Sequence, residues 1–387
     1  MSAGLRAGYK QTEVGVIPED WETKTLGEVG EALIGLTYKP EDVRRYGTLV
    51  LRSSNIQQGV LCFDDNVFVE KEINERIMVR PDDILICVRN GSRNLIGKTA
   101  LLDERTVGMT FGAFMAVFRS PVGKFVNYLF QSDILKRQIN EHLGATINQI
   151  TNGSINSFQI PIPPTDTERS AIAAALSDVD ALLGGQDRLI AKKQGLKVAT
   201  MQQLLTGQTR LPGFSGEWEV KRLGDLLTIC HGKSQRDVEV ADGAYPILAS
   251  GGQIGTAQRA LYDKPSVLIG RKGTINQPRY MDTPFWTVDT LFYSAIKAVN
   301  SAKFLYYRFC LIEWMQYNEA SGVPSLNART IENIKINCPP PKEQTAIAAV
   351  LSNMDTELAA LQARRSKTQA LKQAMMQELL TGRIRLI

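Results

Sequence analysis

Residues 91–99 have the composition of an ATP-binding loop. Gly91 and Gly97 precede Lys98-Thr99, and this is the order in which such a loop offers backbone amides, an ammonium group and a hydroxyl to phosphates and Mg²⁺. The motif has four residues between its glycines, whereas this sequence has five. The four residues 100–103 that follow are too few for the helix that the motif requires. The sequence therefore argues against an ATP site.

Methyl transfer and DNA hydrolysis also lack their motifs. A methyltransferase that acts on base amino groups needs a Gly-rich cofactor loop and an Asx-Pro-Pro-aromatic motif, and neither Pro163-Pro164 nor residues 339–341 are followed by an aromatic residue. A nuclease site that begins at Pro81-Asp82 needs a lysine where residues 103–105 end in arginine. We therefore expect no catalytic residue in this chain.

Polar loops that follow short apolar runs have the residue types that read DNA. Two loops lie in the first half, at residues 52–55 and 89–94, and two in the second, at residues 249–253 and 270–277. Arg, Lys, Asn, Gln and Ser side chains carry the donors and acceptors that match base edges and phosphates. Taken singly, each loop is equally well explained as an ordinary turn, but their occurrence at corresponding places in both halves favours DNA binding. The candidate DNA-binding residues are Lys39, Arg52, Ser54, Asn55, Arg89, Asn90, Ser92, Arg93, Gln235, Arg236, Ser250, Arg271, Lys272, Thr274, Asn276 and Gln277.

Arg89 and Arg271 are interpreted as equivalent residues of the two halves, and Lys39 is matched with Gln235-Arg236. A further set of polar residues precedes each helical region. Packing at the junction of domain and helix explains this set better than DNA contact does. It consists of Thr146, Asn148 and Gln149 in the first half and of Ser325 and Asn327 in the second.

The composition indicates a soluble, cytoplasmic protein with a mild excess of positive charge. The chain has 387 residues, of which 43% are hydrophobic, and a formal net charge of +5, which allows two or three domains and contact with nucleic acid. Its two histidines, His142 and His231, lack the neighbours of a zinc site, so we expect no metal and no cofactor. Residues 1–10 do not resemble a signal peptide, and no apolar run is long enough to span a membrane. Five scattered cysteines indicate reduced thiols.

A long helical segment occurs twice. Residues 171–211 match residues 346–386 without a gap, at an offset of 175 (346 − 171) and with 21 identities in 41 positions. A second repeat precedes each copy, because residues 21–28 match residues 218–225 at an offset of 197 (218 − 21). The order of the chain is therefore globular unit, helix, globular unit, helix.

Prolines and a capping box at residues 165–168 mark the start of the first helix, and Gly207 and Gly382 mark the two helix ends. Two apolar stripes in one chain most simply bury each other, and we expect an antiparallel coiled coil. The basic residues at 192–193, 197, 364–365 and 367 are interpreted as a solvated face. The expected stripes are Ile172, Leu176, Val179, Leu183, Ile190, Leu196, Met201 and Leu204, and Ile347, Leu351, Met354, Leu358, Leu361, Leu371, Met375 and Leu379.

The globular parts are predicted to be α+β domains with mainly antiparallel sheets. Short β-rich runs are separated by turns, and each half ends in a predicted helix, at residues 126–143 and 302–319. The expected strands are residues 48–51, 84–88 and 114–118, and residues 246–248, 267–269 and 291–295. The expected domains are residues 1–160 (first globular domain), 161–212 (first helix), 213–337 (second globular domain) and 338–387 (second helix).

The chain resembles the specificity subunits of Type I restriction–modification systems. The resemblance rests on Ile160-Pro161-Ile162-Pro163-Pro164 before Glu168 and Ala171-Ile172-Ala173, echoed by residues 339–348, on both Leu-Leu-Thr-Gly endings, and on both Trp-Glu-x-Lys-x-Leu-Gly openings. It covers essentially the whole chain. Residues 165–169 depart from the Pro-Pro-Lys-Glu-Gln pattern that the second copy keeps.

The resemblance implies a non-catalytic subunit with two target-recognition domains, each reading one half of a bipartite, asymmetric site in double-stranded DNA. It also implies that the helices set the spacer and dock two methyltransferase subunits, and that restriction subunits join the complex. Two alternatives stay open. The chain could serve a complex that contains a methyltransferase alone, or it could be a protein scaffold that does not bind DNA.

Overall fold

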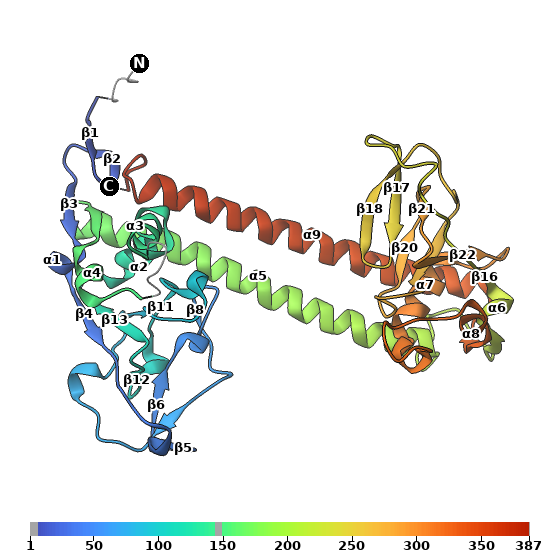
Figure 1. Cartoon of the computed structure of the whole chain (residues 1–387), viewed down its shortest axis with the longest axis horizontal. Helices are drawn as coiled ribbons and strands as arrows, with labels where there is room; N and C mark the ends of the chain where they lie inside the picture. The colour runs from blue at the N-terminus through green and yellow to red at the C-terminus, as the bar shows by residue number, and fades with distance from the viewer. Residues whose placement is uncertain (1–6, 144–148, 387) are drawn as a thin grey trace. The chain divides into compact units, whose positions relative to one another are not determined.

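The computed structural model describes residues 7–143 and 149–386 (Figure 1). The chain forms two compact units, which we call unit 1 (Met1–Gln186 and Arg364–Ile387) and unit 2 (Asp187–Ala363). Each unit contains one globular domain and parts of both long helices, α5 (Asp166–Thr206) and α9 (Pro341–Leu379).

Unit 1 is built on two four-stranded sheets. The first has the order β11-β10-β13-β4 and is antiparallel throughout; the second has the order β12-β6-β9-β5, with one parallel pair, β12 with β6. Smaller pairs are β1 with β2, β3 with β14, and β7 with β8. The strands are β1 (Tyr9–Thr12), β2 (Gly15–Pro18), β3 (Glu22–Thr25), β4 (Glu31–Ile34), β5 (Val43–Arg44), β6 (Thr48–Leu51), β7 (Ile56–Gln57), β8 (Val60–Leu61), β9 (Phe68–Val69), β10 (Ile84–Cys87), β11 (Thr99–Leu101), β12 (Thr110–Phe111), β13 (Met115–Arg119) and β14 (Gln159–Ile162). The short helices are α1 (Leu26–Val29), α2 (Gly123–Gln131), α3 (Asp133–Leu143) and α4 (Asn152–Ser157).

Unit 2 repeats this plan. Its antiparallel sheet has the order β16-β22-β19-β20, its second sheet the order β18-β17-β21 with the parallel pair β17 and β21, and β15 pairs with β23. The strands are β15 (Glu219–Arg222), β16 (Leu227–Cys230), β17 (Tyr245–Ala249), β18 (Gly252–Ala257), β19 (Ser266–Gly270), β20 (Arg279–Met281), β21 (Trp286–Thr287), β22 (Leu291–Ile296) and β23 (Lys335–Cys338). The short helices are α6 (Leu223–Leu226), α7 (Ala302–Leu311) and α8 (Ala328–Asn333). The α+β class with mainly antiparallel sheets is confirmed.

The central strand β10 shows why these apolar runs become strands. Successive side chains of a strand point to opposite faces, and here both faces are covered. Ile84 and Ile86 pack in the core that contains Phe125 and Leu129 of α2. Leu85 and Cys87 pack in the second core, beside β6. A strand buried on both faces reads as a continuous apolar run, which is why the sequence pattern located β10 well.

The predicted helix at residues 126–143 is wrong in one respect, because it is two helices. Ser132 ends α2, and its hydroxyl accepts a hydrogen bond from the amide of Ile134 at the start of α3 (3.3 Å). The predicted helix at residues 302–319 is too long, because α7 ends at Leu311; beyond this end the Trp314 indole donates to the Phe309 carbonyl (2.8 Å). A hydroxyl that competes for backbone amides interrupts a helix without changing its apolar pattern.

The long helices pack antiparallel in each unit, as predicted. In unit 1, Gln186 of α5 donates to Thr368 of α9 (3.1 Å). In unit 2, Lys193 of α5 pairs with Glu357 of α9 (2.6 Å), and Lys197 of α5 pairs with Asp355 of α9. Both lysines were assigned to a solvated face from the sequence, whereas in the structure they make ion pairs between the helices. Gly207 and Gly382, which follow the helix ends, have left-handed φ values of 78° and 68°, as the Leu-Leu-Thr-Gly motif predicts.

Two leucines of the predicted apolar stripes face solvent. Leu196 and Leu371 are exposed by 47% and 54%, whereas Ile172, Leu176 and Leu351 are fully buried. A straight α-helix has 3.6 residues per turn, so a stripe read along the whole length of such a helix drifts around it. Apolar spacing alone therefore does not tell which leucines of a long helix are buried.

A buried glutamate at the start of each long helix binds an arginine that follows the end of the other. Glu168 accepts from Arg385, which also donates twice to Asp20 (3.0 and 2.9 Å). Its counterpart Glu343 accepts from Arg210 at 2.6 Å. The sequence suggested that Glu168 would reach back within its own capping box. Thr165 does accept from the Glu168 amide (3.2 Å), but the carboxylate is used by Arg385.

Candidate DNA interface

The two polar loops of unit 1 lie against each other. Residues 52–55 follow β6 and residues 88–98 follow β10. The Asn90 amide donates to the hydroxyl of Ser53 (3.3 Å), and the Lys98 ammonium donates to its carbonyl (3.2 Å). The structure therefore brings together the two loops that the sequence singled out in the first half.

Within the first loop, Asn55 holds the turn and Arg52 is partly exposed. Asn55 is fully buried; its side-chain oxygen accepts from the Arg52 amide (2.8 Å), and its amide group donates to the Cys62 carbonyl (3.0 Å). Arg52 is one-third exposed and pairs with Asp65 (2.8 Å). Ser54 is half-buried. Asn55 thus shapes the loop that presents Arg52.

Within the second loop, Arg89 lies over an exposed aromatic ring. Its guanidinium is 5.2 Å from the ring centre of Phe114, which is 61% exposed. Ser92 and Arg93 are also exposed, and Arg93 donates to the Asn140 carbonyl (3.5 Å). A guanidinium on an aromatic face is held in place while its donors stay available.

Lys39 is on the surface of unit 1, where it pairs with Glu41 at 3.4 Å. Backbone pairing confirms its match in unit 2. Leu36 donates to the carbonyl of Phe111 in β12 (2.7 Å), and Lys233 donates to the carbonyl of Thr287 in β21 (2.8 Å). The offset from residue 36 to residue 233 is 197, and the same offset makes Arg236 of unit 2 the equivalent of Lys39 in unit 1. Arg236 is exposed and Gln235 is half-buried.

Arg279 of β20 holds the first polar loop of unit 2. Its guanidinium donates to the Ala249 carbonyl (3.5 Å) and the Ser250 carbonyl (3.1 Å), and so ties the loop after β17 to β20. The loop after β19 places three side chains in solvent and two in half-buried positions. Lys272, Asn276 and Gln277 are exposed, whereas Arg271 and Thr274 are half-buried. Arg271 donates to the Asp289 carbonyl (3.2 Å).

Backbone pairing moves the equivalence of Arg89 and Arg271 by one residue. In unit 1 the amides of residues 88 and 89 both donate to the Phe114 carbonyl, at 3.1 Å. In unit 2 the amides of residues 271 and 272 both donate to the Thr290 carbonyl, at 2.8 and 3.2 Å. Arg89 therefore corresponds to Lys272, and Arg271 occupies the place of buried Val88. The predicted equivalence was wrong by one position.

The polar residues ahead of the helices support this alignment. Gln149 forms a β-bridge with Arg89, and Ser325 forms one with Lys272. Asn327 accepts from the amide of Arg329 (2.9 Å) and caps α8. These residues are part of the domain packing, as interpreted from the sequence. Thr146 and Asn148 lie outside the described residues.

A model of the family described as Type I restriction modification DNA specificity domain matches residues 18–190 and 215–370. The chain belongs to this family. The two matched stretches correspond to the two halves of the internal repeat, so each half carries one specificity domain.

Curated relatives of the chain are Type I specificity subunits. The chain is 29% identical over 245 residues to the StySPI specificity subunit of Salmonella potsdam, which covers 57% of this chain and 51% of the relative. It is 25% identical over 423 residues to the putative MjaX specificity subunit of Methanocaldococcus jannaschii, and this match covers 97% of this chain and 96% of the relative. The match thus spans about half of the Salmonella relative and nearly all of the archaeal one.

The fold is that of solved S subunits. The Type I S subunit from M. genitalium superposes with a TM-score of 0.65 at 17% identity, over 93% of this chain and 96% of that one. A structure described as showing complex assembly and conformational transition of the type I R-M system gives a TM-score of 0.57 at 18% identity, over 95% and 99%. This agreement confirms the family's fold, with two domains and two long packed helices.

Three residues beside the loops of this specificity subunit were missed from the sequence. Lys98 was considered only as part of an ATP-binding motif, and the structure places it against the first loop instead. Phe114 follows no polar pattern, but a large exposed aromatic residue next to a basic loop is a recognisable signal. Arg279 lies in a strand and gives none, because its role depends on contacts with residues 30 positions away.

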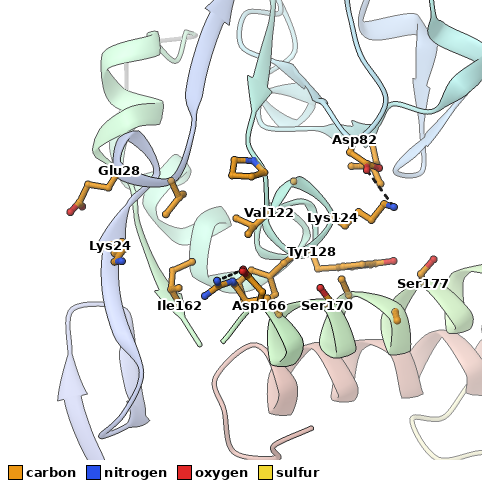
Figure 2. A pocket seen from close by; sticks show the side chains of 18 of the residues that line it. Lys24, Glu28, Asp82, Val122, Lys124, Tyr128, Ile162, Asp166, Ser170 and Ser177 are labelled. Carbon is orange, nitrogen blue, oxygen red and sulfur yellow. Dashed lines mark hydrogen bonds and ion pairs between the residues drawn. The ribbon is translucent and has the colours of Figure 1, made fainter. Parts of the chain in front are cut away.

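A cleft in unit 1 is lined by residues outside these loops. It has a volume of about 980 Å³ and lies between α1, α2 and the start of α5 (Figure 2). Lys124 pairs with Asp82 across one side (3.3 Å), and Arg169 pairs with Asp166 on another. None of the predicted DNA-binding residues lines it. Among residues 7–143 and 149–386, no cluster of metal ligands is present, and no helix is long and apolar enough to cross a membrane.

Proposed function

We propose that this chain is the non-catalytic, sequence-specific DNA-binding subunit of a Type I restriction–modification complex, and that each unit reads one half of a bipartite, asymmetric site. The observation that carries the proposal is the equivalence of the polar loops. The loop after β6 corresponds to the loop after β17, and Arg89 corresponds to Lys272. A scaffold that does not bind DNA gives no reason for exposed basic residues at one backbone position of both domains.

The loops supply two kinds of contact. Arg89 is held over Phe114 with its donors free to make a bidentate contact with a guanine edge in the major groove. Lys272, Asn276 and Gln277 offer corresponding donors from unit 2. Lys39 and Arg236, on the surface at matching positions, are suited to phosphates. Arg52, Ser54, Asn90, Ser92, Arg93, Gln235, Ser250, Arg271 and Thr274 belong to the same proposed surfaces, and Asn55 supports them from within.

The long helices are proposed to set the spacer between the half-sites and to dock two methyltransferase subunits, which restriction subunits then join. Exposed leucines support docking, because apolar side chains on a helix surface mark interaction sites when they recur on one face. Leu182, Leu189 and Leu196 of α5 recur at heptad spacing and are 48%, 41% and 47% exposed. The described assembly of a related type I system is consistent with this proposal.

Mapping of methylated bases tests the proposal. We expect cells that express this chain with the methyltransferase subunit of its own system to modify adenines in one bipartite sequence, as read by single-molecule sequencing. Cells that express the methyltransferase subunit alone are the control and should show no such modification. Absence of any sequence-specific modification with both subunits present would leave the scaffold alternative standing. Activity without a restriction subunit in the genome would favour the methyltransferase-only complex.

Arg89→Ala and Lys272→Ala are expected to weaken discrimination in different half-sites. Loss of a base contact costs about 1–3 kcal/mol, so each change should reduce the preference for its own half-site by about 5-fold to 150-fold. Lys221→Ala is the matched control, since Lys221 pairs with Glu219 (2.8 Å) on the surface of unit 2 and belongs to none of the proposed reading loops. Affinities of the methyltransferase complex for duplexes altered in one half-site measure the effect. Equal losses for all three variants on all duplexes would contradict base reading.

A further inference from the structure

In each unit a buried tyrosine joins the globular domain to the long helix that follows it. The Tyr128 hydroxyl of α2 donates to Asp180 of α5 (3.0 Å), and the Tyr307 hydroxyl of α7 donates to Asp355 of α9 (2.6 Å). Both tyrosines are almost completely buried, with 5% and 0% of their surface exposed. Figure 2 shows Tyr128 lying between α2 and α5. The hydrogen bond therefore fixes the orientation of a domain helix on the long helix.

A lysine from the other long helix completes each site. Lys372 of α9 pairs with Asp180 (2.6 Å), and its ammonium lies 5.4 Å from the ring centre of Tyr128. Lys197 of α5 pairs with Asp355 and lies 5.8 Å from the ring centre of Tyr307. We call these two sites the Tyr–Asp–Lys triads. Each one connects a globular domain, its own long helix and the other long helix.

The two triads are equivalent sites of the internal repeat. Asp180 and Asp355 occupy equivalent positions of the helical repeat, at its offset of 175 (355 − 180), and so do Lys197 and Lys372 (372 − 197). Each tyrosine follows a buried phenylalanine, Phe125 or Phe304, at the same spacing. The globular domains otherwise share little sequence, so the same three side chains have been kept at equivalent places in two domains that differ.

Both triads require a single register of α5 against α9. The spacing from Asp180 to Lys197 on α5 (197 − 180) equals the spacing from Asp355 to Lys372 on α9 (372 − 355). Sliding one helix by a turn separates both ion pairs at once. It would leave charges without partners, above all Lys372, whose side chain is only 9% exposed. Apolar seams tolerate slippage because they are not directional, whereas a buried polar contact favours one alignment.

The tyrosines remain donors throughout the physiological pH range. Burial, together with the neighbouring carboxylates, raises the pKa of Tyr128 and of Tyr307 far above that of an exposed tyrosine. Each hydroxyl therefore keeps its proton, and the Asp180 and Asp355 carboxylates accept from both a hydroxyl and an ammonium group.

We propose that the Tyr–Asp–Lys triads fix the register of α5 against α9 and the seat of each domain on this helix pair, and that they thereby determine which spacer length is accepted between the half-sites. This inference rests on the proposed function for its last step. Tyr128, Asp180 and Lys372, with Tyr307, Asp355 and Lys197, are positioning residues and are not proposed to touch DNA.

An apolar version of the first triad tests the inference in the full-length chain. Tyr128→Phe, Asp180→Leu and Lys372→Met together remove the charges of the site and put apolar side chains of similar shape in their place, and such a replacement of a buried ion pair often preserves stability. Spin labels at positions 182 and 371, both exposed in unit 1, report the helix register through the distance between the labels, which pulsed electron paramagnetic resonance measures. The labels should be genetically encoded amino acids, because the chain has five native cysteines. We expect one narrow label distance in the parent and a broad or double distribution in the variant.

The same variant should change spacer selection in the methylation assay. We expect both half-sites to be kept, while the preference for the best spacer over spacers one base pair longer or shorter falls at least tenfold. Lys193→Met is the matched control: it removes an ion pair between α5 and α9 that involves no triad residue, and it should alter neither measurement. Tyr128→Phe alone, a milder change, should widen the distance distribution less.

A variant label distribution as narrow as that of the parent would overturn the inference, as would unchanged spacer preference in a variant with a broadened distribution. Methylation by the parent chain tests the proposed function separately. If the parent complex modifies no bipartite site, the proposed function fails, and the label distances still decide whether the triads fix the register. Circular dichroism of the variant confirms that both long helices have formed before either measurement is interpreted.

Discussion

Replacing residues 213–335 with the corresponding domain of a related specificity subunit is expected to change one half of the recognised DNA sequence completely and to leave the other half as it was. Phe304, Phe309 and Trp314 of the replaced segment lie in a core of unit 2 that also includes residues of both long helices, such as Leu205 and Leu351. The sheets of the segment pair only with strands of the same unit among the described residues. Because the reading loops of unit 2 all lie inside the segment, the first half-site keeps all of its proposed contacts.

The exchange must keep the contacts that seat the domain. Trp218 donates from its indole to Glu343 (3.1 Å), and Arg308 donates to the Leu205 carbonyl at the end of α5. Tyr307 completes the second Tyr–Asp–Lys triad. A donor domain should therefore carry these three residues or receive them by substitution. A donor that lacks the tyrosine is the matched control, and we expect it to read the new half-site with a less defined spacer.

Single-molecule methylation mapping measures the outcome. The reciprocal exchange of residues 1–160 should change the other half-site, which excludes a general loss of specificity. If either exchange altered both half-sites, the two units would not read DNA independently.

The sequence predicted those parts of this fold whose cause is local or repeated. The Leu-Leu-Thr-Gly endings predict a left-handed backbone conformation at each glycine, and Gly207 and Gly382 adopt it. The apolar runs at β6, β10 and β19 were located to within one residue of their observed bounds. The repeat at an offset of 197 also predicted the correspondence of Lys39 with Arg236, since the first strands of both domains keep that offset.

Contacts between distant residues were not predictable in the same way. The offset between the halves falls from 197 at β6 to 183 at β10, because the first half is longer between these strands, and no sequence identity marks the place. Arg89 was therefore aligned with Arg271 rather than with Lys272. Lys197 was assigned to a solvated face because its partner Asp355 lies in the other helix, far along the chain. Only the antiparallel register of the helices brings the two together.

Arg385→Met is expected to destabilise unit 1 by about 3–5 kcal/mol, because removing one partner of a buried ion pair leaves the other charge without compensation. That charge is Glu168, which is 1% exposed at the first turn of α5. Arg385 donates to both oxygens of Glu168 and to both oxygens of Asp20, and it lies 5.7 Å from the ring centre of Trp21. Hydrogen exchange of the β10 and β13 amides measures the free energy of opening in unit 1, and unit 2 amides provide an internal reference.

Arg383→Met is the matched control. Arg383 pairs with Glu378 at 3.3 Å on the surface, with half of its side chain exposed, so its loss should cost less than about 1 kcal/mol. Adding Glu168→Gln to Arg385→Met should restore part of the lost stability, because a neutral amide is less costly to bury than an unpaired carboxylate. If Arg385→Met cost no more than Arg383→Met, the contacts of Glu168 would not hold the helix start to the domain.

The contacts of Arg385 also predict how the stability of unit 1 depends on pH. Hydrogen bonds from Arg385, opposed in part by burial, lower the pKa of Asp20. A lowered pKa in the folded state stabilises the fold above the ordinary aspartate pKa of about 3.9, and this stabilisation is lost as the pH falls through the folded value. The parent chain should therefore lose stability more steeply below about pH 4 than Arg385→Met does. If the stability of unit 1 fell equally with pH in the two proteins, the Asp20 carboxylate would not be stabilised by Arg385. If the stability of the variant fell less steeply, the acid sensitivity of unit 1 would depend on the same arginine that compensates the charge of Glu168.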